Sequence, residues 1–239
     1  MFKVYHSNRM ENLFDRLVMI TSAPPANPLT SEVIVVQNQG MARWLSLQLA
    51  ERQTVAANLD FPLPASFIWR VFKTTLPHTP EHSIDREFLL WRSMALLPQW
   101  LDKPDFEELK NYLKNDNPEI KRYQLANRIA DVYDQYLVYR PEWIKDWESG
   151  KERHWQAQFW RSLVSDLEKD HRSRLFSRFI ELCDAEQLTG KGLPARLCVF
   201  GITALAPVYL EMLTRISQVI DIHLFVLNPR LCHRGNIAG

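Results

Sequence analysis

Three consecutive amide side chains, Gln37, Asn38 and Gln39, follow a run of β-branched residues and precede an apolar helical pattern. Side-chain amides carry paired donors and acceptors, the chemistry that reads the edges of nucleic-acid bases. Arg43 follows one helical turn later and could add a charged contact. The structural alternative is that the amides cap the helix and hydrogen-bond the turn. The residues alone leave both interpretations open.

The same turn stands where an ATPase would hold nucleotide phosphates. After an early strand of a doubly wound fold, such enzymes carry G-x-x-x-x-G-K-[ST], in which the glycines and lysine approach the phosphates. Residues 37–44 keep one glycine, have no lysine, and place no serine or threonine to hold Mg²⁺. We therefore expect no ATP hydrolysis here and no cofactor in this chain.

A second group of polar side chains lies on a predicted helix over residues 125–137. An apolar stripe occupies one side of this helix, and Asp131, Asp134 and Gln135 fall on the other. The ordinary interpretation is a solvated face in which Arg128 pairs with Asp131. The functional alternative is base discrimination, because carboxylates repel phosphates but accept hydrogen bonds from base amino groups.

Four other side chains are candidates for contact with bases or phosphates. A rigid Pro-Leu-Pro turn presents Leu63, and Trp69 follows it; both could offer surfaces on which bases stack, although a lone tryptophan more often packs in a core. Arg140 follows the acidic helix and could contact a phosphate or a guanine edge. Arg172 is equally well interpreted as a solvated surface charge.

No arrangement of side chains predicts a catalytic centre. The seven histidines are scattered, and the three cysteines form no C-x-x-C pair, so neither a disulfide framework nor a zinc site is indicated. Most remaining tryptophans, including Trp91, fall in helical stripes and are predicted to be structural. We expect a non-catalytic chain.

Composition limits how the chain could meet nucleic acid. The net charge is only +1, so any contact must be local or assisted by partners. No signal-peptide pattern opens the chain, and no apolar run approaches the roughly 18 residues of a membrane span. We expect a cytoplasmic protein with no membrane partner.

Hydrophobic periodicity predicts a parallel α/β sheet. Strands are expected at 2–5 and 33–36, each followed by an apolar helical pattern, with a turn at 37–40 before the second helix. Near the end, strands at 197–200 and 220–226 flank a helix at 207–216 that begins with a proline. The predicted fold class is therefore α/β.

Between these α/β pieces lies a long helical stretch at about 70–190. Its expected breaks are at Pro98, Pro104, Pro118, Pro141 and Gly150. We predict a discontinuous and incomplete α/β domain, 1–70 plus 190–239, into which a helical subdomain, 71–189, is inserted.

Five segments of the chain, spread from one end to the other, resemble the N-terminal part of the RecC family, the gamma chain of bacterial exodeoxyribonuclease V. They are residues 4–9, 37–44, 56–69, 131–141 and 200–209. The resemblance implies a helicase-like fold with a degenerate P-loop, whose ATP motifs have decayed and whose turn faces DNA. We expect the chain to be a fragment of a larger protein, and the much greater length of RecC proteins agrees with this expectation.

The resemblance further implies a channel for single-stranded DNA in a complex with RecB and RecD subunits, which would supply ATP and Mg²⁺ sites. In that family the complex unwinds and degrades duplex ends, and RecC recognises the Chi sequence as the 3′-ended strand passes. The residues that the resemblance implicates are Gln37, Gln39, Arg43, Leu63, Trp69, Asp131, Val132, Asp134, Gln135, Arg140 and Arg172.

Three of these positions depart from the family's pattern, which has a small hydroxyl residue at Gln39, a glutamine at Arg43 and a leucine at Val132. The sequence that is read could therefore differ. Two alternatives stay open at this stage: a fragment of an active helicase related to RecB or AddB, which the missing phosphate loop disfavours, and an unrelated α/β enzyme with a helical cap.

Overall fold

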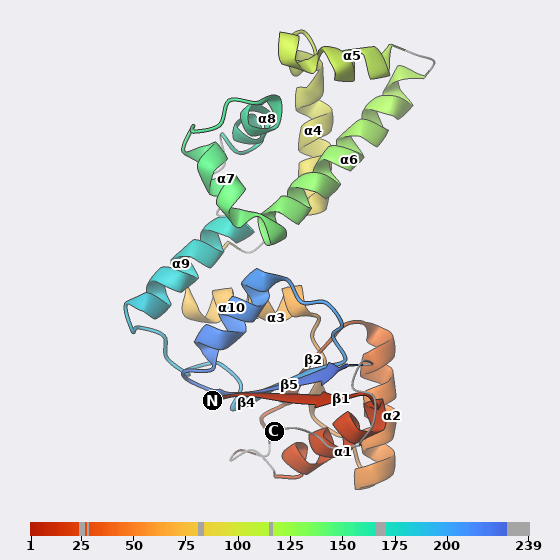
Figure 1. Cartoon of the computed structure of the whole chain (residues 1–239), viewed down its shortest axis with the longest axis vertical. Helices are drawn as coiled ribbons and strands as arrows, with labels where there is room; N and C mark the ends of the chain where they lie inside the picture. Colours follow the sequence, from red (N-terminus) through yellow and green to blue (C-terminus); the bar gives the residue numbers. More distant parts are fainter. Residues whose placement is uncertain (24–26, 28, 81–83, 115–116, 166–170, 229–239) are drawn as a thin grey trace. The chain divides into compact units, whose positions relative to one another are not determined.

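The computed structural model describes residues 1–23, 27, 29–80, 84–114, 117–165 and 171–228. Its contacts divide the chain into two compact units. The first unit comprises residues 1–77 and 179–239, and the second comprises residues 78–178. The second unit therefore lies, in sequence, between the two segments of the first (Figure 1). That each unit is a separate folding domain stays a prediction.

A five-stranded sheet forms the centre of the first unit. Its strands are β1 (Phe2–Ser7), β2 (Glu32–Val36), β3 (Leu59–Asp60), β4 (Arg196–Phe200) and β5 (Asp221–Leu227). They lie in the order β1-β5-β4-β2-β3, and every neighbouring pair is parallel. The predicted parallel α/β sheet is confirmed. The two residues of β3 are too few to produce a periodic pattern, and the sequence did not predict this strand.

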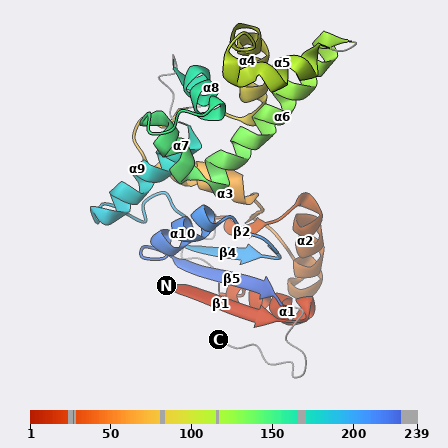
Figure 2. The ribbon, with the colours of Figure 1, turned by 45° about the horizontal axis from the view of Figure 1, so that its top comes forward.

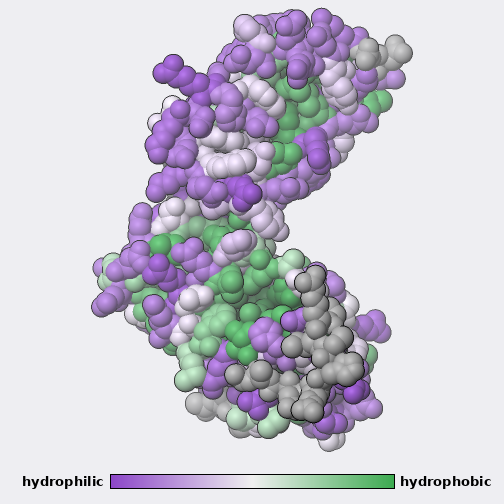
Figure 3. Space-filling model, in the orientation of Figure 1, coloured by the Kyte–Doolittle hydropathy of each residue, from purple (hydrophilic) through white to green (hydrophobic). Residues whose placement is uncertain are grey.

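Helices cover both faces of this sheet (Figure 2). One face carries α1 (Met10–Thr21) and α2 (Gln39–Gln53), and the other carries α3 (Pro64–Thr75) and α10 (Pro207–Ile216). The β-branched and aromatic residues of β2 and β4 are buried, as a strand covered on both faces requires. The visible face of this unit has a hydrophobic area around α10, where Leu210 is exposed (Figure 3).

The connections of the sheet reverse direction between β4 and β2. From β4 the chain passes through α10 to its neighbour β5, whereas from β2 it passes through α2 to β3, on the opposite side. Such a reversal opens a crevice outside the carboxyl ends of the two strands, where ligands of doubly wound folds bind. The residues that follow β2 and β4 therefore meet at this edge.

The second unit is helical. It contains α4 (Arg86–Trp100), a 3₁₀ turn (Pro104–Phe106), α5 (Glu107–Leu113), α6 (Pro118–Tyr139), α7 (Pro141–Glu148), α8 (Trp155–Val164) and the beginning of α9 (Arg172–Asp184). Its core is rich in aromatic rings: Tyr133 lies edge-on to Trp147 and Trp160, with centroids 6.0 and 5.5 Å apart. The visible face of this unit is mainly hydrophilic (Figure 3).

Several sequence-based expectations about helices need correction. Pro98 lies inside α4, in its last turn, and does not break it; the helix ends two residues later. Helix α2 begins at Gln39, so the predicted turn is two residues shorter. Trp91 is 57% exposed and is not a core residue. Within the described residues, no helix combines the length and the apolar composition that crossing a membrane requires.

Candidate nucleic-acid interface

Gln37 and Thr203 meet where β2 and β4 end. In the parallel pairing Val36 lies opposite Phe200, so the chain leaves both strands at the same level. The Thr203 hydroxyl then donates to Oε1 of Gln37 over 3.4 Å, although 166 residues separate the two in sequence. Both side chains are exposed. An amide and a hydroxyl therefore stand at the point where the connections of the sheet reverse.

The next two amides have different roles. Oδ1 of Asn38 accepts a hydrogen bond of 2.9 Å from the backbone N–H of Met41 and caps α2. The capping interpretation is thus confirmed for Asn38. Gln39 begins the helix with its side chain exposed, and it makes no side-chain hydrogen bond within the described part of the chain. Its amide is free to bind another molecule.

Arg43 and Leu63 extend this edge. Arg43 lies one turn into α2, exposed, and forms no ion pair with the residues that the structure describes. The Val36 N–H donates to the Pro62 carbonyl over 3.1 Å, which brings the exposed Leu63 next to the end of β2. Trp69 is partly buried in the second turn of α3, edge-on to another ring. The structure therefore groups Gln37, Gln39, Arg43 and Leu63 and leaves Trp69 farther along α3.

On α6 of the second unit, Asp131 is held by an ion pair. Its partner is Arg86 at the start of α4, which also donates to Oδ1 of Asn127 over 2.7 Å. The Arg128 pairing expected from helical spacing is wrong. The hydrogen bond to Asp131 raises the pKa of Arg86 above its ordinary value. Asp131 thus links α6 to α4.

Asp134 is also paired. Its Oδ1 atom lies 3.2 Å from Nη1 of Arg172, and the two side chains are 28% and 22% exposed. This oxygen is buried and accepts no hydrogen bond of good geometry in the described part of the chain, so the contact is an ion pair only. The expectation that Asp134 lies on a freely solvated face is wrong. Arg172 is likewise a partly buried ion-pair partner and not a solvated surface charge.

The remaining candidates on this helix are less constrained. Gln135 is exposed, and Val132 is partly buried at the side of the apolar stripe. Arg140 lies between α6 and α7, exposed, with its guanidinium 5.5 Å from the centroid of the Trp143 ring. Asp131, Asp134 and Gln135 share one side of α6, while Arg140 stands at its C-terminal end.

A buried cluster that the sequence did not predict anchors the start of α9. Glu148 accepts hydrogen bonds from His171 at 2.6 Å, from Arg174 at 3.0 Å and from the Trp160 indole at 3.1 Å. Burial would raise the pKa of Glu148, but the hydrogen bond and charge of His171, with those of its other partners, hold this pKa below its ordinary value. His171 is only 1% exposed, and it precedes Arg172 directly.

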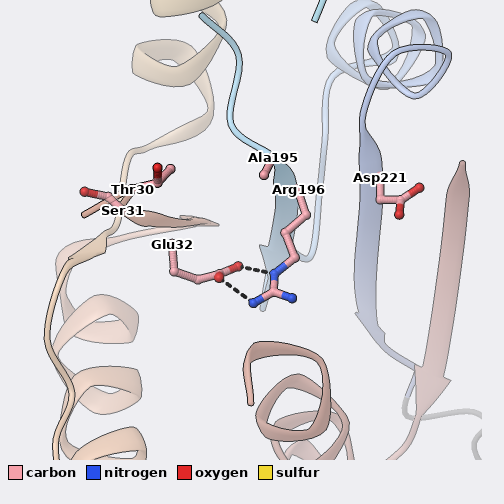
Figure 4. Close-up of a pocket in the computed structure, with 6 residues that line it drawn as sticks. All are labelled: Thr30, Ser31, Glu32, Ala195, Arg196 and Asp221. Atoms are coloured by element: carbon pink, nitrogen blue, oxygen red, sulfur yellow. Dashed lines mark hydrogen bonds and ion pairs between the residues drawn. The ribbon is translucent and has the colours of Figure 1, made fainter. Parts of the chain in front are cut away.

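A pocket at the opposite, amino edge of the sheet offers no free charge. Arg196 reaches across it to Glu32 with two hydrogen bonds of 2.8 and 2.6 Å, and also donates to the Ala23 carbonyl (Figure 4). The hydrogen bonds to Glu32 raise the pKa of Arg196. Thr30, Ser31, Ala195 and Asp221 complete the lining. This ion pair joins β4 to β2 and is structural.

The two groups of candidates offer hydrogen-bonding, charged and apolar side chains. Among the described residues, no three His, Cys, Asp or Glu side chains are placed to hold a metal ion. Neutral amides, a hydroxyl, an arginine and a leucine make up the sheet edge, and acids paired with arginines make up the α6 face. Both sets suit the recognition of polar edges and flat apolar rings.

Comparison with known proteins adds a family. A family model described as "RecC, N-terminal domain" matches residues 2–238. A RecBCD enzyme subunit RecC from Escherichia coli K12 is 41% identical over 99% of this chain and 22% of its own length. The Haemophilus influenzae subunit is 39% identical over all of this chain and 24% of its own length, and the Mycolicibacterium smegmatis subunit is 27% identical over 95% and 21%. The chain spans less than a quarter of each of these relatives.

Proposed function

The chain belongs to the RecC family, and on this premise we propose that it is the N-terminal part of a non-catalytic, DNA-binding subunit of an ATP-dependent exodeoxyribonuclease V complex. In this proposal the subunit guides the 3′-ended single strand from an unwound duplex end and recognises Chi during double-strand-break repair and recombination. RecB and RecD subunits are its partners, carry the ATP and Mg²⁺ sites, and act with it in the cytoplasm.

The loss of the phosphate loop supports a helicase-like domain with a degenerate P-loop. Both early strand-to-helix connections lack the required chemistry: residues 8–9, after β1, contain no glycine, and residues 37–44, after β2, contain no lysine. A parallel sheet covered on both faces is the framework on which such loops are carried in nucleotide-binding folds. In this proposal the helical unit, 78–178, is the inserted subdomain.

The observation that carries the proposal is the composition of the carboxyl edge of the sheet, where the connections of β4 and β2 reverse. Gln37 and Gln39 present amides, and Leu63 presents an apolar surface, where an active NTPase would present backbone N–H groups and a lysine. Amides discriminate among base edges, and apolar side chains contact base faces. A subunit that reads a DNA strand needs side chains that contact bases. This edge carries such side chains at the position where an NTPase binds phosphates.

The α6 face supports the same function by a different means. Its ion pairs to Arg86 and Arg172 fix the Asp131 and Asp134 carboxylates and offset part of their repulsion for phosphates. A carboxylate has about four acceptor positions, so one arginine leaves others for base amino groups. Gln135 adds an exposed amide beside them.

Site-specific photocrosslinking in the assembled complex tests the proposal. A benzophenone amino acid would replace Gln39 or Gln135 in the full-length subunit, which is then combined with its partner subunits and a 3′-labelled duplex. Irradiation during unwinding should join the 3′-ended strand to both positions. Gln53, at the far end of α2, and Gln99, at the end of α4, are matched exposed controls and should not crosslink. Active complexes that crosslink at neither Gln39 nor Gln135 would refute the proposal.

A further inference from the structure

The loop between β4 and α10 is fixed in place. Gly201 adopts a φ of +67°, which glycine tolerates, and a Cβ atom there would lie only 2.8 Å from Cε of Met41 on α2. Ile202 and Ala206 are buried on either side of Thr203. The close approach to α2 and these two anchors leave Thr203 exposed at a defined position.

Thr203 faces the side-chain amide of Gln37, the residue that directly follows β2. Its hydroxyl donates to Oε1 of Gln37, so the amide nitrogen Nε2 of Gln37 is left to donate elsewhere. A glutamine side chain on the surface otherwise rotates among several rotamers, and it loses that freedom on binding. A neighbouring hydroxyl that holds the amide in advance lowers this entropic cost and selects which atom faces the ligand.

We propose that Thr203 is a positioning residue for base recognition, which orients the Gln37 amide so that its N–H group donates to an acceptor atom on one base of the passing single strand. This inference rests on the proposed function. It assigns the β4–α10 loop to the recognition surface, opposite the β2–α2 turn. The base selected through Gln37 is one that presents an acceptor, such as N7 or O6 of guanine or N7 of adenine.

The experiment uses the full-length subunit in the assembled complex and measures the Chi response on a set of duplexes that carry single-base changes at each position of the recognised sequence. Gln37→Ala first identifies the position that Gln37 reads. Thr203→Val should lower discrimination at that same position by about 3- to 10-fold, the range that one neutral hydrogen bond contributes. Thermal stability should not change, because Thr203 is exposed.

Three further variants separate positioning from a general effect. Thr203→Ser keeps the hydroxyl and should restore discrimination. Thr214→Val removes an exposed threonine hydroxyl that bonds only within α10, and it should have no effect. The Gln37→Ala, Thr203→Val double variant should lose no more discrimination than Gln37→Ala alone, because the two residues act as one unit.

If Thr203→Val keeps wild-type discrimination while Gln37→Ala loses it, the inference is wrong and the proposed function stands. The inference is equally wrong if Thr203→Val lowers discrimination to the same extent at all positions. If Gln37→Ala has no effect at any position, the inference also fails, and the crosslinks at Gln39 and Gln135 decide separately whether the strand passes these surfaces.

Discussion

The carboxyl edge of the sheet and the polar face of α6 hold their candidate side chains in opposite ways. At the sheet edge, Gln39 and Arg43 are exposed and bond to nothing else within the described residues, while Asn38 caps the helix that carries them. On α6, Asp131 and Asp134 are each tied to an arginine from another helix. If both surfaces serve recognition as proposed, the first separates recognition from stability, and the second combines them.

This difference has an electrostatic reason. Neutral amides can stand exposed beside a polyanion without repelling it, so they need no partner. Carboxylates in the same setting cost affinity unless cations offset them, and paired arginines supply that offset within the protein. Substitutions should therefore reduce the stability of the second unit but mainly change recognition at the first.

The largest effect should follow Glu148→Gln, which removes the charge that three donors share. His171 would stay buried without its carboxylate, at a cost of about 2–3 kcal/mol in the free energy of unfolding. Hydrogen exchange of the full-length subunit should show α7 and the start of α9 opening more often, with no change in the sheet. Unchanged exchange at α9 would contradict the proposed role of this cluster.

The same variant predicts a pH dependence. The folded-state pKa of Glu148 lies below its ordinary value of 4.5, so its stabilisation is fully present above that pH and is lost as pH falls through the folded pKa. The difference in thermal unfolding temperature between wild type and Glu148→Gln should thus shrink as the pH falls below about 4.5. A difference in unfolding temperature that grows as the pH falls would contradict this prediction.

Asp134→Ala should have the next largest effect. It leaves Arg172 partly buried without its anion and should cost about 1–2 kcal/mol in stability. A double-mutant cycle with Arg172→Gln measures the coupling directly. Asp146→Ala, which removes a more exposed partner of Lys151, is the control and should cost less. A coupling energy of zero between Asp134 and Arg172 would show that their ion pair does not stabilise the fold, as expected for two charges on a solvated face.

Asn38→Ala should have a smaller effect, and it tests the sheet edge. Loss of the cap of α2 should cost about 1 kcal/mol. Gln39→Ala, one residue later, should leave the thermal unfolding temperature unchanged, because its side chain bonds to nothing in the described structure. Equal costs for the two substitutions would show that recognition and stability are not separated there.

Arg43→Gln should have the smallest effect on stability, within about 0.5 kcal/mol, because Arg43 is exposed and unpaired within the described residues. Its effect on recognition should be a shift of the preferred base from guanine towards adenine at one position, worth about 1–3 kcal/mol. The measurement is the Chi response with single-base variants. Arg52→Gln, near the end of α2, is the control. Unchanged preference in Arg43→Gln would remove Arg43 from the recognition surface.

Local patterns were enough to predict much of the fold. The β-branched run of β2 and the proline that begins α10 each act within a few residues, and both elements lie where expected. Pro98 misled because it falls in the last turn of α4, so the helix ends two residues after it and not before it. Short β3 was missed because it is defined only by its pairing with β2.

The candidate sites show where sequence reasoning stops. Helical spacing offers partners three or four residues away, so it proposed Arg128 for Asp131, whereas the partner Arg86 lies 45 residues away. Thr203 is 166 residues from Gln37 in sequence, and no local pattern predicted that the two side chains meet. Charge pairing across helices depends on tertiary packing, which residue types along the chain do not encode locally.

Of the three consecutive amide residues, only Asn38 caps α2. Gln39 and Arg43 can therefore be substituted without loss of this cap. Exchanging Gln39 or Arg43 disturbs no helix cap and no buried contact, so such changes escape purifying selection on folding. If this edge reads DNA as proposed, related chains can diverge at Gln39 and Arg43 in the sequence they read while their architecture stays the same.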